Sequence, residues 1–121
     1  MIRIIKPDFR FDDARGSLIQ LLGSGCMQVN SVYTVKGAVR GRNHYHRFNE
    51  ETFFIVSGSV HVRVSLDGIS EEYDFSSGDM FCIEKFVRHD ITFNEDTYMV
   101  VMYDRGVELE DGTKDIIEDS D

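Results

Sequence analysis

The sequence predicts an all-β protein, folded in one domain as a barrel or a double-sheet jelly roll. Short runs rich in β-branched and aromatic residues recur at roughly ten-residue spacing, with glycine-containing turns between them. No stretch shows a convincing helical period, and the only proline, Pro7, interrupts none of these runs. With 121 residues, of which 41% are hydrophobic, the chain is long enough to build one hydrophobic core.

The predicted strands of the first half begin with residues 17–22, a β-type run that Gly23-Ser24-Gly25 closes. Residues 29–35 form the next run and end at a Lys36-Gly37 turn. Residues 52–56 are apolar on both faces, as expected for a strand buried between two layers. The second face of such a strand needs a cover, which either a homodimer formed by sheet packing or the N-terminal residues would supply.

The second half opens on Ser57-Gly58, the signal for a tight hairpin. Valines at positions 60, 62 and 64 then alternate with polar residues, which predicts a half-buried strand with His61 at the surface rather than in a metal site. Ile116 and Ile117 form either a short turn or a last strand. Further turns at 67–68 and 76–79 separate strands that we expect at residues 80–83, 89–93 and 98–103.

Composition excludes several classes of partner. The net charge of −9 argues against nucleic acid, because neutralising phosphates takes a basic surface. No apolar run approaches the ~18 residues of a membrane helix, and residues 1–6 lack the pattern of a signal peptide, so we expect no membrane partner. The two cysteines, Cys26 and Cys82, have no close spacing and fit a reducing cytoplasm.

Charge is distributed unevenly along the chain. From about residue 104 an acidic C-terminal tail carries eight acidic residues against Arg105 and Lys114, a net charge of −6, and we expect it to solvate the end of the chain. The opposite bias surrounds two histidines, His44 and His46, and would favour a small anionic ligand. The basic residues concerned are Lys36, Arg40, Arg42 and Arg47, with Lys85 and Arg88 before His89.

Three histidines and a glutamate are the most informative residues. His44 and His46 would project to one side of a strand, about 7 Å apart, because successive strand residues alternate between its faces. Glu51 follows five residues after His46, and His89 comes much later. Neutral imidazoles and a carboxylate suit Zn, Fe, Mn or Ni, and a set of two histidines and one carboxylate leaves coordination positions open. The alternative is a pair of histidines on a solvated strand face.

The same residues resemble the first conserved motif of the cupin family. Gly37 leads to His44-x-His46, then to Glu51 and the hairpin glycine Gly58, with six residues between the last two as in that motif. The interval from Gly37 to His44 is one residue longer than usual, as if Arg42 or Asn43 were inserted.

The stretch from Gly78 to His89 resembles the second cupin motif. Glu84 stands where proline is usual, Phe86 stands where glycine is usual, and Asn94 comes one position late. The resemblance implies a cupin double-stranded β-helix, a jelly-roll barrel with a divalent metal ion between its strands. It implies that the metal ligands are His44, His46, Glu51 and His89.

A narrower resemblance concerns small cupins that act on dTDP- or UDP-keto-sugars. Asp13-Ala14-Arg15-Gly16 looks like their D-x-R-G opening, and Val32-Tyr33 and Arg40-Gly41 fit the same pattern. The chain also resembles the cupin domain of capsular polysaccharide synthesis enzymes, some of which bind zinc and epimerise a keto-sugar. In contrast, the 3,4-ketoisomerases of this group need no metal and use the histidine pair as acid and base.

The resemblance implies a carbohydrate or nucleotide-sugar isomerase or epimerase that acts at a carbon next to a carbonyl. Either a metal polarises the carbonyl, or His44 or His46 moves the proton directly. Tyr33 either donates a proton or is a buried aromatic residue of its strand. We expect Arg40, Arg42 and Arg88 to hold a diphosphate, because the guanidinium fork matches phosphate geometry. A metal-dependent dioxygenase and a non-catalytic cupin that binds a small ligand are the alternatives.

Overall fold

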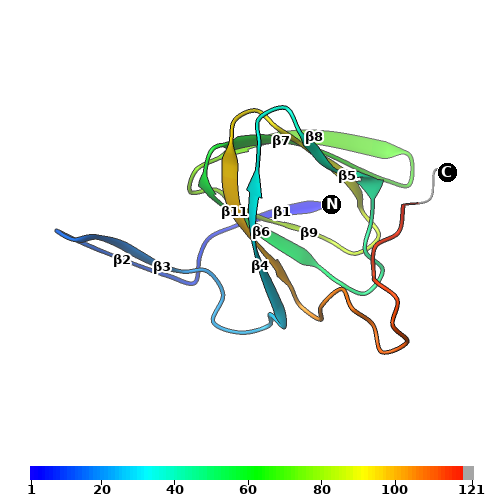
Figure 1. Ribbon diagram of the computed structural model, residues 1–121, viewed down its shortest axis with the longest axis horizontal. Coiled ribbons are helices and arrows are strands. Elements are labelled where there is room, and N and C mark those ends of the chain that lie inside the picture. Colours follow the sequence, from blue (N-terminus) through cyan, green and yellow to red (C-terminus); the bar gives the residue numbers. More distant parts are fainter. Residues whose placement is uncertain (119–121) are drawn as a thin grey trace.

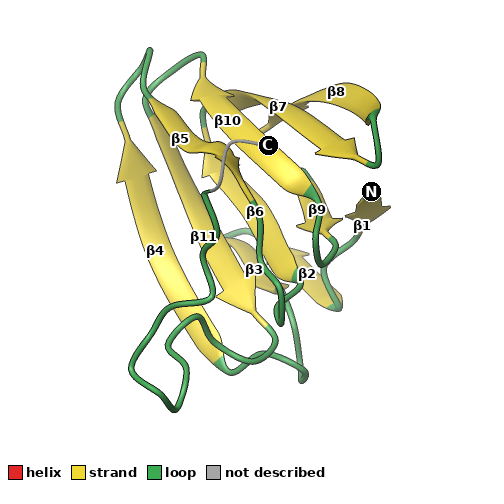
Figure 2. Ribbon diagram, turned by 90° about the vertical axis from the view of Figure 1, so that its right-hand side faces the viewer, coloured by secondary structure: helices red, strands yellow, loops and turns green. Residues whose placement is uncertain are grey.

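Two antiparallel sheets face each other in the computed structural model, which describes residues 1–118 (Figure 1, Figure 2). One sheet has the strand order β1-β9-β6-β11-β4 and the other β5-β10-β7-β8. These residues contain no helix, so the all-β jelly-roll prediction is confirmed. The strands are β1 (Ile2–Ile5), β2 (Phe9–Asp13), β3 (Gly16–Gln20), β4 (Gln28–Thr34), β5 (Val39–His44), β6 (Glu51–Ser57), β7 (Ser59–Leu66), β8 (Ile69–Ser76), β9 (Met80–Ile83), β10 (Arg88–Phe93) and β11 (Thr97–Tyr103).

No helix capable of crossing a membrane is found in the described part of the chain.

The core lies between the inner faces of the two sheets, and β7 shows how the sequence pattern builds it. Val60, Val62 and Val64 are completely buried, while the alternate residues face outward. His61 lies on that outer side and hydrogen-bonds Asp74 and Glu72 of β8, at 2.8 Å each. The prediction that His61 lies on the outward, polar face of its strand is confirmed.

Strand β6 is apolar on both faces, and each face has a different cover. Phe53 and Ile55 point into the core between the sheets. On the other face Phe54 packs in a small outer cluster with Met80 and Met102, against which Ile5, Ile19, Leu21 and Leu22 are placed. The N-terminal residues therefore cover part of this face. Val56, one step further along β6, stays 49% exposed.

The hairpin formed by β2 and β3 belongs to neither sheet and projects away from the barrel (Figure 1). Its apolar residues Phe9, Phe11 and Leu18 are about half exposed, at 52%, 49% and 58%. A two-stranded hairpin alone is at best marginally stable in water, and Ile19 of β3 is the residue of this arm that packs on the outer cluster of the barrel.

Strands β5 and β10 pair irregularly near the histidines. His44 is opposite His89 and Arg40 is opposite Ile91, so three residues of β5 face the single Asp90 of β10. All three have positive φ, at 99° for Gly41, 40° for Arg42 and 65° for Asn43, and the Asn43 N–H donates to the Asp90 carboxylate at 2.7 Å. The strands therefore form a bulge with two extra residues in β5 relative to β10, and it lies in the interval between Gly37 and His44.

Candidate metal centre

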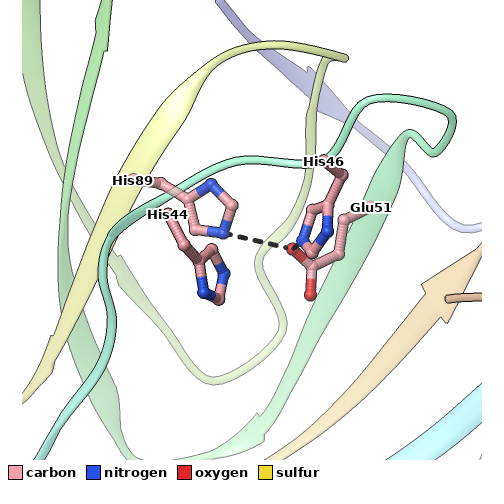
Figure 3. A group of neighbouring side chains, drawn as sticks. All are labelled: His44, His46, Glu51 and His89. Atoms are coloured by element: carbon pink, nitrogen blue, oxygen red, sulfur yellow. Dashed lines mark hydrogen bonds and ion pairs between the residues drawn. The ribbon is translucent and has the colours of Figure 1, made fainter. Parts of the chain in front are cut away.

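Four side chains converge at one end of the barrel (Figure 3). His44 is the last residue of β5, Glu51 the first of β6 and His89 the second of β10, while His46 lies in the loop between β5 and β6. Their candidate ligand atoms all lie within 4.8 Å of one another. His46, Glu51 and His89 are buried and His44 is half-buried, so the group is closed toward the core and accessible at His44.

The spacing predicted that His44 and His46 would share a regular strand, and this prediction is wrong. Strand β5 ends at His44, and Tyr45 forms only an isolated bridge with Ile117. Ile116-Ile117 therefore adds a bridge rather than a last strand. The two imidazoles nevertheless point to the same side, with ring centroids 5.1 Å apart. Tyr45 points the other way, where the Arg88 guanidinium lies 4.7 Å from its ring centroid.

Backbone carbonyls orient two of the imidazoles. His46 Nδ1 donates to the Asp115 carbonyl at 2.7 Å, and His89 Nδ1 donates to the Val87 carbonyl at 3.2 Å. A carbonyl oxygen only accepts, so both Nδ1 atoms carry a proton and both Nε2 atoms face Glu51 Oε1, at 3.0 and 3.3 Å. Metal-binding histidines in proteins are held in this way, so the residues present fit a divalent ion.

Glu51 is also held from its other oxygen. The Tyr103 hydroxyl donates to Glu51 Oε2 at 2.8 Å. Burial, reinforced by the Glu51 charge, raises the pKa of Tyr103, so this hydroxyl stays protonated and a donor. Tyr103 was not among the residues singled out from the sequence, although it continues the inward alternation of Met99 and Val101 on β11.

The ionisable groups of this cluster have pKa values that are shifted from their ordinary values. Burial would raise the pKa of Glu51, but hydrogen bonds from His46 and His89 hold it below its usual range. Burial would lower the pKa of His46, but its hydrogen bond with Glu51 raises it above the ordinary value. Burial, together with His89 and His46, lowers the pKa of His44 to about 4, so His44 is neutral at pH 7.

We expect the affinity for a divalent metal to decrease as the pH is lowered, by roughly tenfold for each pH unit below the pKa of His46. The metal must displace the proton that Glu51 stabilises on His46 Nε2, whereas His44 has no proton to lose above about pH 4. Titration calorimetry in buffers of different ionisation enthalpy measures the protons released. Metal binding that releases no proton near neutral pH would contradict this electrostatic account.

A cavity of about 400 Å³ opens beside the four side chains. Its inner wall is largely apolar, with Phe53, Ile91, Met99 and Val101 next to His44, Glu51 and His89. Two predicted anion-binding residues, Arg40 and Arg42, also line it. Arg40 Nε donates to the Thr34 hydroxyl at 2.8 Å, which links β5 to β4 across the cavity. Ile116 and Glu118 contribute a further part of the lining from the C-terminal segment.

Two predicted site residues lie elsewhere. Tyr33 of β4 is 45% exposed on the outside of the five-stranded sheet, beside Tyr98 at a ring distance of 4.6 Å, because its neighbours Val32 and Thr34 face inward. Arg88 precedes the inward-facing His89, so it points outward and lines a separate surface pocket with Tyr45 and Phe86. The structure does not bring either residue to the cavity.

The acidic tail is more than a solvated end. Asp115 is 1% exposed, so the expectation that the tail only solvates the chain end is wrong for this residue. Its carboxylate and the fully buried Asn49 link the C-terminal segment to the loop that carries His46. Asp119 and Asp121, also counted in the tail, lie outside the described residues.

Residues 31–104 match the family model of the Cupin domain. Comparison with curated proteins finds no match to this sequence.

Several solved structures share the architecture. A sugar 3,4-ketoisomerase from Thermoanaerobacterium thermosaccharolyticum, a double mutant in complex with TDP, superposes with a TM-score of 0.80 at 20% identity, over 98% of this chain and 87% of that one. A TDP-quinovose 3,4-ketoisomerase from Campylobacter jejuni gives 0.82 at 19% identity, over 98% and 92%. A dTDP-4-dehydrorhamnose 3,5-epimerase from Sulfolobus tokodaii gives 0.68 at 22% identity, over 84% and 69%. At these identities the likeness establishes the fold.

Proposed function

Because this chain belongs to the cupin family, we propose that it is a metal-dependent isomerase or epimerase of a carbohydrate or nucleotide sugar, acting at a carbon next to a carbonyl. The observation that carries the proposal is the convergence of His44, His46, Glu51 and His89 on one point, beside a cavity that Arg40 and Arg42 also line. The structural likeness to sugar ketoisomerases and epimerases supports the same class of substrate.

We propose that His46, Glu51 and His89, the buried members, hold the divalent ion, while His44, the accessible fourth member, stays free to act as a base. Zn, Fe, Mn and Ni all accept this donor set. When bound, the ion would polarise the substrate carbonyl and make the adjacent C–H more acidic.

The remaining steps fall to the chain's own residues. His44 is neutral at pH 7 and lines the cavity, so it takes the proton from the carbon next to the carbonyl. It then gives a proton, which can exchange with solvent, to another carbon of the enediol-like intermediate. Arg40 and Arg42 bind the anionic part of the substrate, and the apolar wall holds its hydrocarbon edge and excludes water.

Proton exchange with solvent tests this function. Incubated in D2O with UDP- or dTDP-linked keto-sugars, the metal-loaded protein is expected to place deuterium on the carbon next to the carbonyl, which mass spectrometry detects. His44→Asn should abolish the exchange while the metal stays bound. A chelated sample is the control. The absence of exchange from every such substrate, together with no effect of UDP or dTDP on the melting temperature, would refute the proposal.

A metal-dependent dioxygenase is the second candidate, because two histidines and one carboxylate around an open position also suit non-haem iron. It requires iron in the purified protein and oxygen consumption with substrate. A cupin that only binds its ligand would show the melting-temperature shift without deuterium exchange or oxygen consumption.

We also propose that the chain forms a homodimer through the outer face of β4, β11 and β6. Val29, Tyr33, Val56 and Tyr98 are apolar or aromatic side chains that are 45–62% exposed on or beside this face, which a second copy of the chain would cover. The projecting β2–β3 hairpin gives independent support, since its Phe9, Phe11 and Leu18 stay about half exposed although Ile19 packs on the barrel. Cys26 and Cys82 are free thiols, which supports a reducing cytoplasm as the compartment.

The variant Tyr98→Glu is expected to weaken the dimer by about 100-fold or more, because it buries an unpaired charge at the centre of the interface. Light scattering coupled to gel filtration measures the mass. Arg63→Glu, on the outer face of the other sheet, is the matched control and should leave the dimer intact. A wild-type monomer at micromolar concentration would exclude the interface.

A further inference from the structure

The C-terminal strap, residues 107–118, crosses the end of the barrel where the histidines lie (Figure 2). Its centre is Asp115, whose carboxylate is buried and accepts three hydrogen bonds from the loop that carries His46. The donors are the backbone N–H of Arg47 at 2.7 Å, the backbone N–H of Phe48 at 2.8 Å and the side-chain amide of Asn49 at 2.8 Å.

Asn49 extends this attachment to the chain before the strap. It is completely buried, and its Oδ1 accepts from the backbone N–H groups of Arg105 and Gly106, at 3.0 and 2.8 Å. Its amide nitrogen also donates to the Gly106 carbonyl at 2.9 Å. The loop between β5 and β6 is thus held to the C-terminal residues at two points, and all these buried polar groups are paired.

The backbone of Asp115 makes the contact that matters for the metal centre. Its carbonyl accepts the Nδ1 proton of His46 at 2.7 Å. The next residues keep that carbonyl in place, because Tyr45 and Ile117 exchange two backbone hydrogen bonds of 3.0 Å each. His89 obtains the equivalent support from Val87, two residues away, whereas His46 depends on a segment 69 residues further along the chain.

We propose that Asp115 is a positioning residue for the metal centre. Its carboxylate clamps the strap to the loop, and the clamped carbonyl holds His46 in the tautomer and ring orientation that direct Nε2 at Glu51. The strap is therefore part of the site and not an appendage. The effect of Asp115 on metal affinity rests on the proposed metal function, but its effect on the His46 ring does not.

The test compares Asp115→Asn and Asp115→Ala with Asp111→Asn. Asp111 is an exposed acid of the same strap whose carboxylate accepts hydrogen bonds from Thr113, so its variant matches the loss of charge away from His46. Nitrogen-15 NMR of histidine-labelled protein, without metal and loaded with Zn²⁺, follows the Nδ1 proton of each imidazole. Competition with a chelating dye measures Zn²⁺ affinity.

Wild type and Asp111→Asn are expected to show a slowly exchanging Nδ1 proton on His46. In both Asp115 variants the Nδ1 proton of His46 should exchange rapidly with solvent, while the Nδ1 proton of His89 should still exchange slowly. The affinity for Zn²⁺ should fall by about 10- to 100-fold. A general loss of stability would instead affect both imidazoles alike. If Asp115→Ala does not fold, the nearly isosteric variant Asp115→Asn still tests whether Asp115 holds the His46 ring.

Unchanged His46 protection in a folded Asp115 variant would overturn the inference, as would equal loss at His46 and His89. If wild type binds no Zn²⁺, the proposed function fails, and the metal-free spectra still decide the role of Asp115.

Discussion

Replacing Glu51 with glutamine is expected to lower the affinity for a divalent ion by at least about 100-fold, more than the loss of an outer hydrogen-bond partner costs. The change removes the only anionic ligand of the set, and its oxygens currently face His46 Nε2, His89 Nε2 and the Tyr103 hydroxyl. A glutamine amide would turn a donor toward one of these buried groups and leave it without an acceptor.

Thermal unfolding reports this loss directly. At a free metal concentration of 100 times the dissociation constant, binding stabilises the wild type by about 2.7 kcal/mol, which raises the melting temperature by roughly 10 °C. Glu51→Gln should show almost none of this rise at the same concentration. Glu50→Gln is the matched control, because Glu50 is the adjacent acid and pairs with Arg3 outside the barrel. Equal metal-induced shifts in the two variants would remove Glu51 from the metal site.

The substitution Gly41→Ala is expected to destabilise the fold by about 3 kcal/mol and to weaken metal binding as well. Gly41 has a φ of +99°, and a Cβ there would lie 2.7 Å from the His89 carbonyl oxygen and 3.4 Å from the His89 ring. The contact is with backbone, so β5 must shift away from β10, and this shift separates His44 from His89.

Gly68→Ala is the control for Gly41→Ala. Gly68 also has a positive φ, +82°, but a Cβ there meets nothing within 4 Å. The Gly68→Ala substitution should lower the free energy of unfolding only by the cost of placing an alanine at positive φ, about 1 kcal/mol, and should leave the metal affinity unchanged. Calorimetric melting and metal titration of both variants measure the difference. If the two alanine variants had the same melting temperature and the same metal affinity, the close approach of β5 to β10 would not contribute to stability or to metal binding.

The jelly roll could be predicted because its inner strands carry the pattern that burial imposes. The alternation of Val60, Val62 and Val64 and the double-faced run of β6 each reflect a tertiary environment that the sequence records. Strands β1, β2 and β8 were not expected. Strand β8 lies at a sheet edge, and its acidic residues Glu71 and Glu72 interrupt the alternation of Ile69, Tyr73 and Phe75.

The site could be predicted where local spacing determines it. His44, His46, Glu51 and His89 come together as their spacing and the family resemblance implied. Tyr33 and Arg88 do not, although alternation from their inward neighbours would have placed both outside. Phe86 occupies the usual glycine position of the second motif with a φ of +68°, so the turn that precedes His89 is kept at a cost in backbone strain.

Asn49 and Asp115 could not have been found from the sequence. Asp115 is one acid among eight in the tail, and only the docking of the strap gives it buried partners. Its importance comes from contacts across 66 to 69 residues, for which the spacing of nearby residues carries no signal.

Elemental analysis of the protein purified without chelator tests the central claim most directly. We predict about one divalent ion per chain in the wild type and its loss in His46→Ala, since we propose that His46, Glu51 and His89 hold a single ion. A folded wild type with clearly substoichiometric metal, which still isomerised a keto-sugar in the presence of chelator, would contradict this account and assign the histidines directly to proton transfer.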